Sequence, residues 1–306
     1  MIFYLLSTLA LAALIIGSIT DIKKREVPDW INYSLIACGF GFNLIYSVIL
    51  WDFSYIINSS IGFFIFLIFA LIMFYSGQWG GGDSKLLMGL GSAFGINFLF
   101  FKMLYFNILN LFKPIYPTFY VEMPFALNFL VNSLLVGALY GLLWSVILIF
   151  MNGKSFIREL KKLLNESRKA RKCLLVSMPI LVAITYFSLD FPNNLIVISL
   201  FLLLFLVFYL YTFIKAVENS CMLKYVEPTK LTEGDWIGKD ITIDGRHLCG
   251  PKDLGISKSQ IKEIIGFYNE GKIKKVLIKE GIPFVPSFLV AFILTLIYGN
   301  LVLLFI

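Results

Sequence analysis

Long apolar blocks are the feature of this sequence that most limits the folds open to it. Each block is about twenty residues long, and a helix of that length crosses a hydrocarbon core of roughly 30 Å. Hydrophobic residues make up 59% of the 306 residues, more than in a soluble domain. We therefore expect an all-α polytopic membrane protein of about eight transmembrane helices. The predicted spans are approximately Ile2–Thr20, Trp30–Leu50, Tyr55–Ser76, Lys85–Phe101, Phe125–Met151, Cys173–Leu189, Asn194–Ile214 and Phe284–Ile306.

The basic residues predict how these spans are oriented. If the N-terminus lies outside, 24 of the 26 Lys and Arg residues fall on the inner side, and only Lys102 and Lys113 remain outside. Such an excess is typical of cytoplasmic loops. We therefore expect a multi-pass plasma-membrane protein with both termini outside. Topology also accounts for the net charge of +7, so no nucleic-acid partner is expected. An interfacial aromatic belt is predicted to hold Trp30, Trp51 and Trp79.

The loops suggest five parts. These are an N-terminal transmembrane core at 1–151, a basic cytosolic linker at 152–172, a transmembrane hairpin at 173–214, a small cytosolic domain at 215–283 and a C-terminal transmembrane helix at 284–306. Apolar residues at helical spacing in the linker suit an amphipathic helix lying on an anionic leaflet. A solvated connector explains the same pattern equally well.

The segment 215–283 has mixed local patterns. The stretch "EGDWIGKDITIDGRHL" alternates like short strands around turn glycines, and "ISKSQIKEIIGFYNEGKI" has the pattern of a helix. Ser257 is a plausible N-cap of that helix, and Gly271 is expected to end it. The segment is therefore predicted to be a small α+β domain.

Two acidic residues stand at the ends of predicted spans. Asp21 follows the first span and Asp83 precedes the fourth, so the predicted topology puts both at the inner membrane border. An acid at such a depth is costly and often functional. Two converging carboxylates perform aspartyl-protease chemistry, in which an ionised one takes a proton from water and a protonated one polarises the scissile carbonyl. Asp21 and Asp83 are thus candidate catalytic residues.

Three glycines, Gly80, Gly81 and Gly82, precede Asp83. Backbone without side chains approaches a helix or a substrate closely, and here it is expected to place Asp83 on a non-helical segment that lines a wet cavity. A plainer explanation is equally open. The glycines then form only a turn, and Asp83 caps the next helix.

The stretches "TDIKKREVPDW" and "GGGDSKLLMGLG" together resemble the type IV prepilin peptidases, a family of GxGD membrane aspartyl proteases. Its first Asp ends the first helix and precedes basic residues and an Ile/Val-Pro pair, and its second Asp closes a GxGD motif that leads into a Lys. The resemblance implies Asp21 and Asp83 as the catalytic pair. It implies a motif or substrate-binding role for Lys23, Arg25, Pro28, Gly80, Gly81, Gly82 and Lys85. At Asp29 the family more usually has Asn, and this third carboxylate is expected to shift the titration of the pair without replacing Asp21.

Two C-terminal stretches, "LTEGDWIGKDI" and "EGIPFVPSFLVAF", look like the archaeal branch, which processes preflagellins (archaellins) or archaeal pilins. The resemblance implies a membrane endopeptidase that removes the short basic leader of such precursors at the cytosolic face, with precursors and lipids as partners. Bacterial members carry two CxxC pairs and often methylate the new N-terminus. The four cysteines here form no such pair, so neither methyltransferase activity, a metal nor another cofactor is expected.

Two other classes of function stay open on the sequence. A transporter or channel would use the acids to bind a cation or relay protons, with the glycines as a helix break. A non-catalytic scaffold of a pilus or secretion assembly would use the cytosolic domain as its binding surface. The border position of the acids and the lack of repeated halves favour the peptidase. The oligomeric state is left open.

Overall fold

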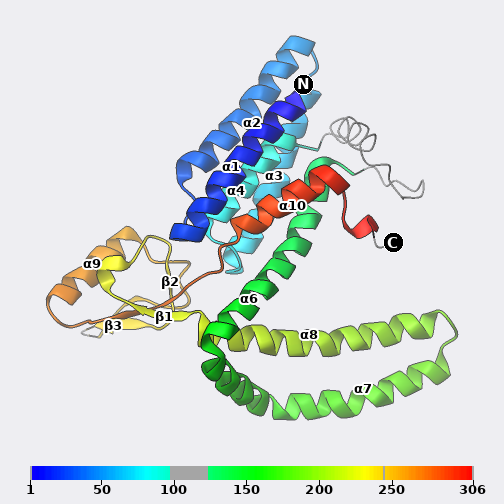
Figure 1. The fold of residues 1–306 in the computed structure, drawn as a ribbon, viewed down its shortest axis with the longest axis vertical. Coiled ribbons are helices and arrows are strands. Elements are labelled where there is room, and N and C mark those ends of the chain that lie inside the picture. The colour runs from blue at the N-terminus through cyan, green and yellow to red at the C-terminus, as the bar shows by residue number, and fades with distance from the viewer. Residues whose placement is uncertain (1, 97–122, 244, 305–306) are drawn as a thin grey trace. The chain divides into compact units, whose positions relative to one another are not determined.

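The computed structural model describes residues 2–96, 123–243 and 245–304. The chain divides into two compact units, one comprising Met1–Leu142 with Gly281–Ile306, the other Leu143–Glu280. Figure 1 shows that helices dominate, and the described strands all fall in the second unit. The predicted outer lysines, Lys102 and Lys113, and the end of the fourth predicted span lie outside the described residues.

The first unit is a helical bundle. Local sequence sets several helix ends: Pro28 stands at the N-cap of α2, and Gly77 follows α3 with a φ of 70°, which favours glycine. Its elements are α1 (Ile2–Lys24), α2 (Asp29–Leu50), α3 (Ser54–Tyr75), α4 (Gly81–Phe94), the first part of α6 (Phe125–Glu166), α10 (Val285–Tyr298) and the 3₁₀ turn η2 (Val302–Leu304).

Helix α4 is packed closely between α2 and α3. A methyl group at Gly62 of α3 would lie 2.5 Å from the Cα of Gly95, and one at Gly39 of α2 would lie 2.8 Å from the amide nitrogen of Ala93. The helices therefore touch through backbone. Asn43 of α2 donates to the carbonyl of Ala93 at 3.2 Å. These contacts fix the C-terminal end of α4.

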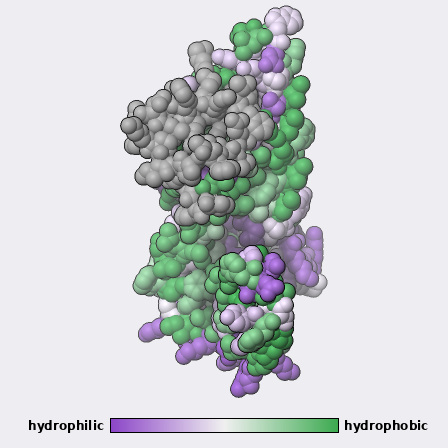
Figure 2. All heavy atoms as spheres, turned by 90° about the vertical axis from the view of Figure 1, so that its right-hand side faces the viewer, coloured by the Kyte–Doolittle hydropathy of each residue, from purple (hydrophilic) through white to green (hydrophobic). Residues whose placement is uncertain are grey.

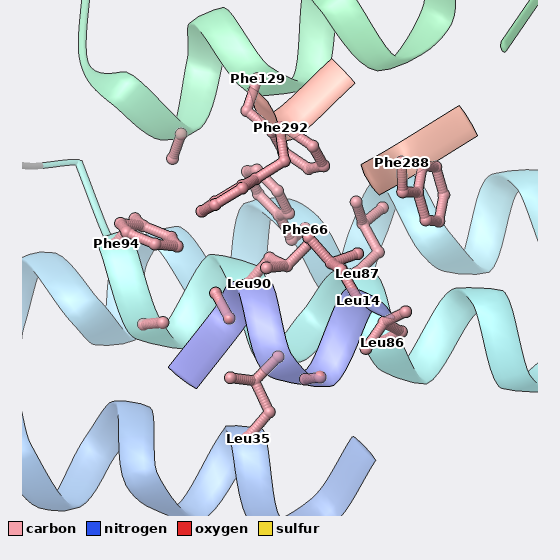
Figure 3. Close-up of a cluster of buried hydrophobic side chains, with 14 of the residues drawn as sticks. Leu14, Leu35, Phe66, Leu86, Leu87, Leu90, Phe94, Phe129, Phe288 and Phe292 are labelled. Atoms are coloured by element: carbon pink, nitrogen blue, oxygen red, sulfur yellow. The ribbon is translucent and has the colours of Figure 1, made fainter. Parts of the chain in front are cut away.

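A cluster of apolar side chains forms the core of this unit. Figure 3 shows residues from all its helices converging on α4. Aromatic rings predominate: Phe94 and Phe125 have centroids 4.7 Å apart, and Phe292 of α10 lies 5.5 Å from both. The buried side chains labelled in the figure are Leu14, Leu35, Phe66, Leu86, Leu87, Leu90, Phe94, Phe129, Phe288 and Phe292. The core thus ties α10, the last helix, to the first four.

The second unit begins within α6, whose helical geometry breaks at Asn152 (φ −126°). It continues through α7 (Arg168–Ser188), α8 (Asn193–Cys221), β1 (Leu223–Val226), the 3₁₀ turn η1 (Pro228–Lys230), β2 (Trp236–Ile237), β3 (Ile241–Ile243), β4 (Arg246–Cys249), α9 (Lys258–Asn269) and β5 (Val276–Lys279). The strands form an antiparallel sheet in the order β1-β5-β2, with Tyr225 opposite Leu277, and a separate β3-β4 pair.

The predicted α+β segment is confirmed by these strands and by α9. Ser257 is the N-cap of α9, and its hydroxyl accepts the amide hydrogen of Gln260 at 3.3 Å. Gly271 follows the helix with a φ of 77°. Ile237, Ile264 and Val276 belong to a buried cluster that joins the sheet to α9. This segment therefore has a core of its own.

The helical part has the character of a membrane protein. Six of the described helices are long and apolar enough to cross a bilayer, namely α1, α2, α3, α6, α7 and α8. Helix α10 is also apolar, but it is shorter than these six, with 14 residues. Helix α4 has the same length. Many large apolar side chains are exposed, and Figure 2 shows hydrophobic residues (green) over much of the visible face. The polytopic class predicted from the sequence is confirmed.

One smaller expectation needs adjustment. Trp30 and Trp51 are exposed, as interfacial residues would be, but Trp79 is only 5% exposed. The prediction for Trp79 is wrong because aromatic rings of α3 and α10 surround it.

In the linker, Phe156 is buried and belongs to a cluster with Ala216 and Val217 of α8, so protein covers part of its apolar face. The linker is helical, and the choice between a helix lying on the leaflet and a solvated connector stays open.

Candidate active site

Asp21 lies in the last full turn of α1 and faces inward. It is 6% exposed, and its Oδ2 accepts a hydrogen bond of 3.0 Å from the backbone amide of Val285. Val285 is the first residue of α10. A buried carboxylate requires such a partner, because an unpaired one is strongly destabilising. The position of Asp21 is therefore set by the start of a helix 264 residues later in the chain.

Asp83 lies in the first turn of α4 and is half-buried. Its Oδ2 accepts the amide hydrogen of Gly80 at 3.0 Å, which closes the start of the helix. The expectation of a non-helical segment is therefore wrong: α4 already begins at Gly81. The plainer expectation, that Asp83 caps a helix, is confirmed. Capping uses one carboxylate oxygen and leaves the other for further chemistry.

The two carboxylates come within electrostatic range of each other. Val27, from the loop after α1, explains how. A methyl group at Gly82 would lie 3.0 Å from Val27 Cβ, and one at Gly17 of α1 would lie 3.7 Å from Val27 Cγ1. The side chain of Val27 is thus wedged between the helices that carry the two acids. Glycine at position 82 permits this close approach.

The other two glycines are less crowded. A methyl group at Gly80 would meet only Asp83 Oδ2 within 4 Å, at 3.5 Å, and one at Gly81 would meet only Phe74, at 3.9 Å. Gly81 is exposed. Of the three, Gly82 is required for packing inside the protein, while Gly80 and Gly81 leave open space beside Asp83.

Aromatic stacking joins the start of α4 to the start of α10. The ring centroid of Trp79 lies 5.4 Å from that of Phe284 and 5.1 Å from that of Phe288. On the other side of Phe284, Gly137 of α6 lies so close that a methyl group there would be 2.4 Å from the ring. The segments that hold Asp83 and Asp21 are therefore fixed against each other by one cluster.

The motif residue Lys85 forms an ion pair with Asp29, the residue at which this sequence differs from the usual family pattern. Lys85 Nζ lies 2.6 Å from Asp29 Oδ1 and 5.4 Å from the ring centroid of Tyr33. Both charged side chains are substantially exposed, 36% for Lys85 and 61% for Asp29. Asp29, the third carboxylate, is therefore paired with Lys85. This ion pair connects the first turn of α2 to the first turn of α4.

The remaining motif residues lie around the end of α1. Lys23 is exposed in the last turn, and Pro28 is the N-cap of α2. Arg25 follows α1 with a φ of 59° and is within electrostatic range of Asp21. Tyr140 of α6 is also in range of Asp21. Arg25 thus brings a positive charge near the carboxylate pair at this end of the bundle.

Three contributors to the site were not predicted from the sequence: the Val285 amide, the burial of Trp79 and Tyr140. Only the Val285 amide was indicated by any pattern in the sequence. The stretch "EGIPFVPSF" places a proline near the start of an apolar helix, which is typical of a helix N-terminus, but nothing in it indicates Asp21 as the partner. Within residues 2–96, 123–243 and 245–304, no group of three or more His, Cys, Asp or Glu side chains forms a metal site.

The fold and this site define a polytopic helical membrane protein with two converging carboxylates, each bound by a backbone amide at a helix start. Residues 8–142 match the family model described as "Type IV leader peptidase family". This part of the chain, which contains both acids, is similar to that family, in line with the resemblance seen in the sequence.

Similar proteins carry the name "Preflagellin peptidase". The one from Methanococcus maripaludis is 44% identical over 92 residues, which are 30% of this chain and 38% of the relative. That of Methanocaldococcus jannaschii is 42% identical over 79 residues, 26% of this chain and 33% of the relative. The chain thus covers about a third of the length of these relatives. No solved structure gives a significant match.

Proposed function

We propose that this protein is an integral-membrane aspartyl endopeptidase that removes the short basic leader from archaellin or type IV pilin-like precursors. One observation carries the proposal: Asp21 and Asp83, from helices far apart in the chain, come within electrostatic range of each other. The match of residues 8–142 to the leader peptidase family and the names of the relatives support the substrate class. Water is the nucleophile, and no metal or covalent intermediate takes part.

The position of the pair suits such a substrate. A precursor with an apolar helix after a basic leader sits in the bilayer with its leader on the inner side, as the charge distribution of this protein predicts for its own loops. The scissile bond then reaches the level at which α1 ends and α4 begins. The open space beside Gly80 and Gly81 admits a locally extended peptide, as cleavage requires, because a helix hides its carbonyls.

The test uses purified protein in lipid nanodiscs with a full-length archaellin precursor. The wild type is expected to release one leader, and sequencing of the new N-terminus identifies the bond. Asp21→Asn and Asp83→Asn are each expected to lower the rate by at least about a thousandfold, the scale of a lost catalytic acid or base. Asp52→Asn is the matched control, since Asp52 lies in the loop between α2 and α3 and caps Ser54.

The outcomes separate the classes of function. Cleavage at the normal rate by either dyad variant would rule out the two-carboxylate mechanism. Absence of cleavage by the wild type, with all variants well folded, would favour a transporter or scaffold.

The cytosolic location of the pair is tested by single reactive cysteines near Asp21 and Asp83 in a Cys-free background. Labelling of the two from opposite faces would exclude a shared site.

A further inference from the structure

Asp21 and Asp83 are held differently, and the difference points to separate roles. We propose that the first turn of α10 fixes Asp21 as the ionised carboxylate of the pair, so that Asp21 accepts a proton from the attacking water and Asp83 gives one to the substrate carbonyl. Val285 is then a positioning residue that acts through its backbone amide. The inference deepens the proposed peptidase function and rests on it.

The start of α10 offers an anion the amides of Phe284 and Val285. The first amides of a helix have no partner within it. Pro286 has no amide hydrogen, and the amide of Ser287 donates to the carbonyl of Phe284 at 2.9 Å. The amide of Val285 donates to Asp21 instead, at 3.0 Å in a buried setting, and that of Phe284 also interacts with the carboxylate. The partial positive charge of a helix start favours an ionised acid there.

The charged and titratable groups around Asp21 come from three elements. Arg25, one turn after Asp21, contributes a positive charge, and Asp83 on α4 contributes an acid. Tyr140 on α6 is a phenol, which is neutral at ordinary pH. The described part of α10 carries no titratable side chain before Tyr298. The nearby cation therefore adds to the effect of the amides and stabilises a negative charge on Asp21.

Asp83 has weaker support for a charge. It accepts one amide hydrogen, from Gly80, and lies in the field of Asp21. The lysine two residues further on is engaged by Asp29. Two close carboxylates share one proton, because their like charges repel, and the proton stays on the less stabilised member. That member is Asp83.

The assignment gives a balanced hydrolysis. The water oxygen attacks the scissile carbonyl carbon, one water proton passes to Asp21, and the Asp83 proton passes to the carbonyl oxygen. The gem-diol then returns a proton to Asp83 as the carbonyl reforms and the C–N bond breaks. The departing nitrogen takes the proton held by Asp21. The pair ends in its starting state, and one water has been consumed.

The experiment removes the Val285 hydrogen bond and leaves the Phe284 amide in place. Replacing Val285 by its α-hydroxy acid puts an ester oxygen in place of the amide N–H, and Val285→Pro removes the same donor at a helix position that tolerates proline. Val285→Ala is the control. It keeps the donor and loses the side chain, which is buried beside Gly17. All variants are measured for kcat/KM against pH on the archaellin precursor.

The expected result is a change in the shape of the pH profile. In the ester and proline variants the acidic limb moves by about one pH unit to higher pH, because a hydrogen bond to a charged group is lost. The alanine variant keeps the wild-type limb. A loss of activity that is equal at all pH values, or the same profile in all three variants, would overturn the assignment and leave the proposed function standing.

A second measurement does not depend on cleavage. Isotope-edited infrared spectra of the wild type at neutral pH are compared with those of Asp21→Asn and Asp83→Asn. We expect the protonated-carboxyl band to disappear in Asp83→Asn. In Asp21→Asn, Asp83 no longer lies in the field of a second carboxylate, so its band should weaken at neutral pH and return at mildly acidic pH. Removing the Val285 donor in the Asp83→Asn background is expected to restore a protonated band on Asp21 at mildly acidic pH. Persistence of the wild-type band in Asp83→Asn would reverse the roles, whether or not the protein is a peptidase.

Discussion

Gly82 and Val27 pack so closely that a single added methyl group would lie 3.0 Å from Val27 Cβ and 3.2 Å from its amide nitrogen. Gly82 precedes Asp83, and Val27 lies in the loop after the helix that carries Asp21. The contact therefore joins the two halves of the candidate site through backbone and a short side chain, with no room for adjustment by a flexible group.

Gly82→Ala is expected to lower the free energy of unfolding by about 1–3 kcal/mol, since overpacking moves backbone. It should also lower precursor cleavage more than stability alone explains, because it pushes α4 away from the end of α1. Gly81→Ala is the matched control for stability, as its added methyl has nothing closer than 3.9 Å. Thermal unfolding of both variants and the cleavage rate of Gly82→Ala check this. Equal losses of stability at the two positions would contradict the packing argument.

Asp29→Asn is expected to keep most of the cleavage activity. The ion pair between Asp29 and Lys85 is short, at 2.6 Å, but exposed, so its contribution to stability is at most about 1 kcal/mol. The substitution is chemically identical to Asp83→Asn, and the two variants are compared at the same pH and salt. If Asp29→Asn were as inactive as Asp83→Asn, the catalytic pair would have been assigned wrongly.

Asn132→Ala is expected to destabilise the first unit by about 3 kcal/mol. Asn132 is fully buried; its amide donates to Thr295 Oγ1 at 2.9 Å and to the Gly299 carbonyl at 2.6 Å, and it accepts the Leu301 amide at 2.9 Å. Its loss leaves buried backbone groups unpaired.

The control for this variant is Ser133→Ala, because the Ser133 hydroxyl bonds only within its own helix, to Leu130 at 2.8 Å. Thermal unfolding in detergent measures both variants, and a loss below about 1 kcal/mol for Asn132→Ala would show that water replaces the missing amide.

Cys249 is expected to react slowly with soluble thiol reagents. Its side chain is buried, and burial together with the carboxylates of Asp253 and Asp240 raises the pKa of the thiol to about 11. The reactive thiolate is therefore scarce at pH 8, and its fraction should rise about tenfold per pH unit up to that value.

The comparison is made in a chain whose other cysteines are replaced. Ser259→Cys, combined with Cys249→Ala, places an exposed thiol on α9 of the same segment and should label quickly at pH 8. Similar rates for the two thiols would mean that the segment opens readily.

The sequence alone determined the membrane class, the approximate spans and the two acids. Hydrophobicity over twenty residues and a motif around each Asp are local properties, so they can be recognised without contacts. The small α+β segment was equally predictable, because Ser257 and Gly271 mark a helix by their own backbone preferences.

Only the tertiary structure decided how the acids are held. Trp79 was predicted at the interface and is buried, since its partners are rings of α3 and α10. Asp83 was expected off the helix and begins it, because its own carboxylate caps the first turn. The amide that binds Asp21 belongs to Val285, and no local pattern around either residue encodes a contact across 264 positions. The residue types indicated the chemistry of the two carboxylates. Their orientation depends on which helix ends the packing brings together.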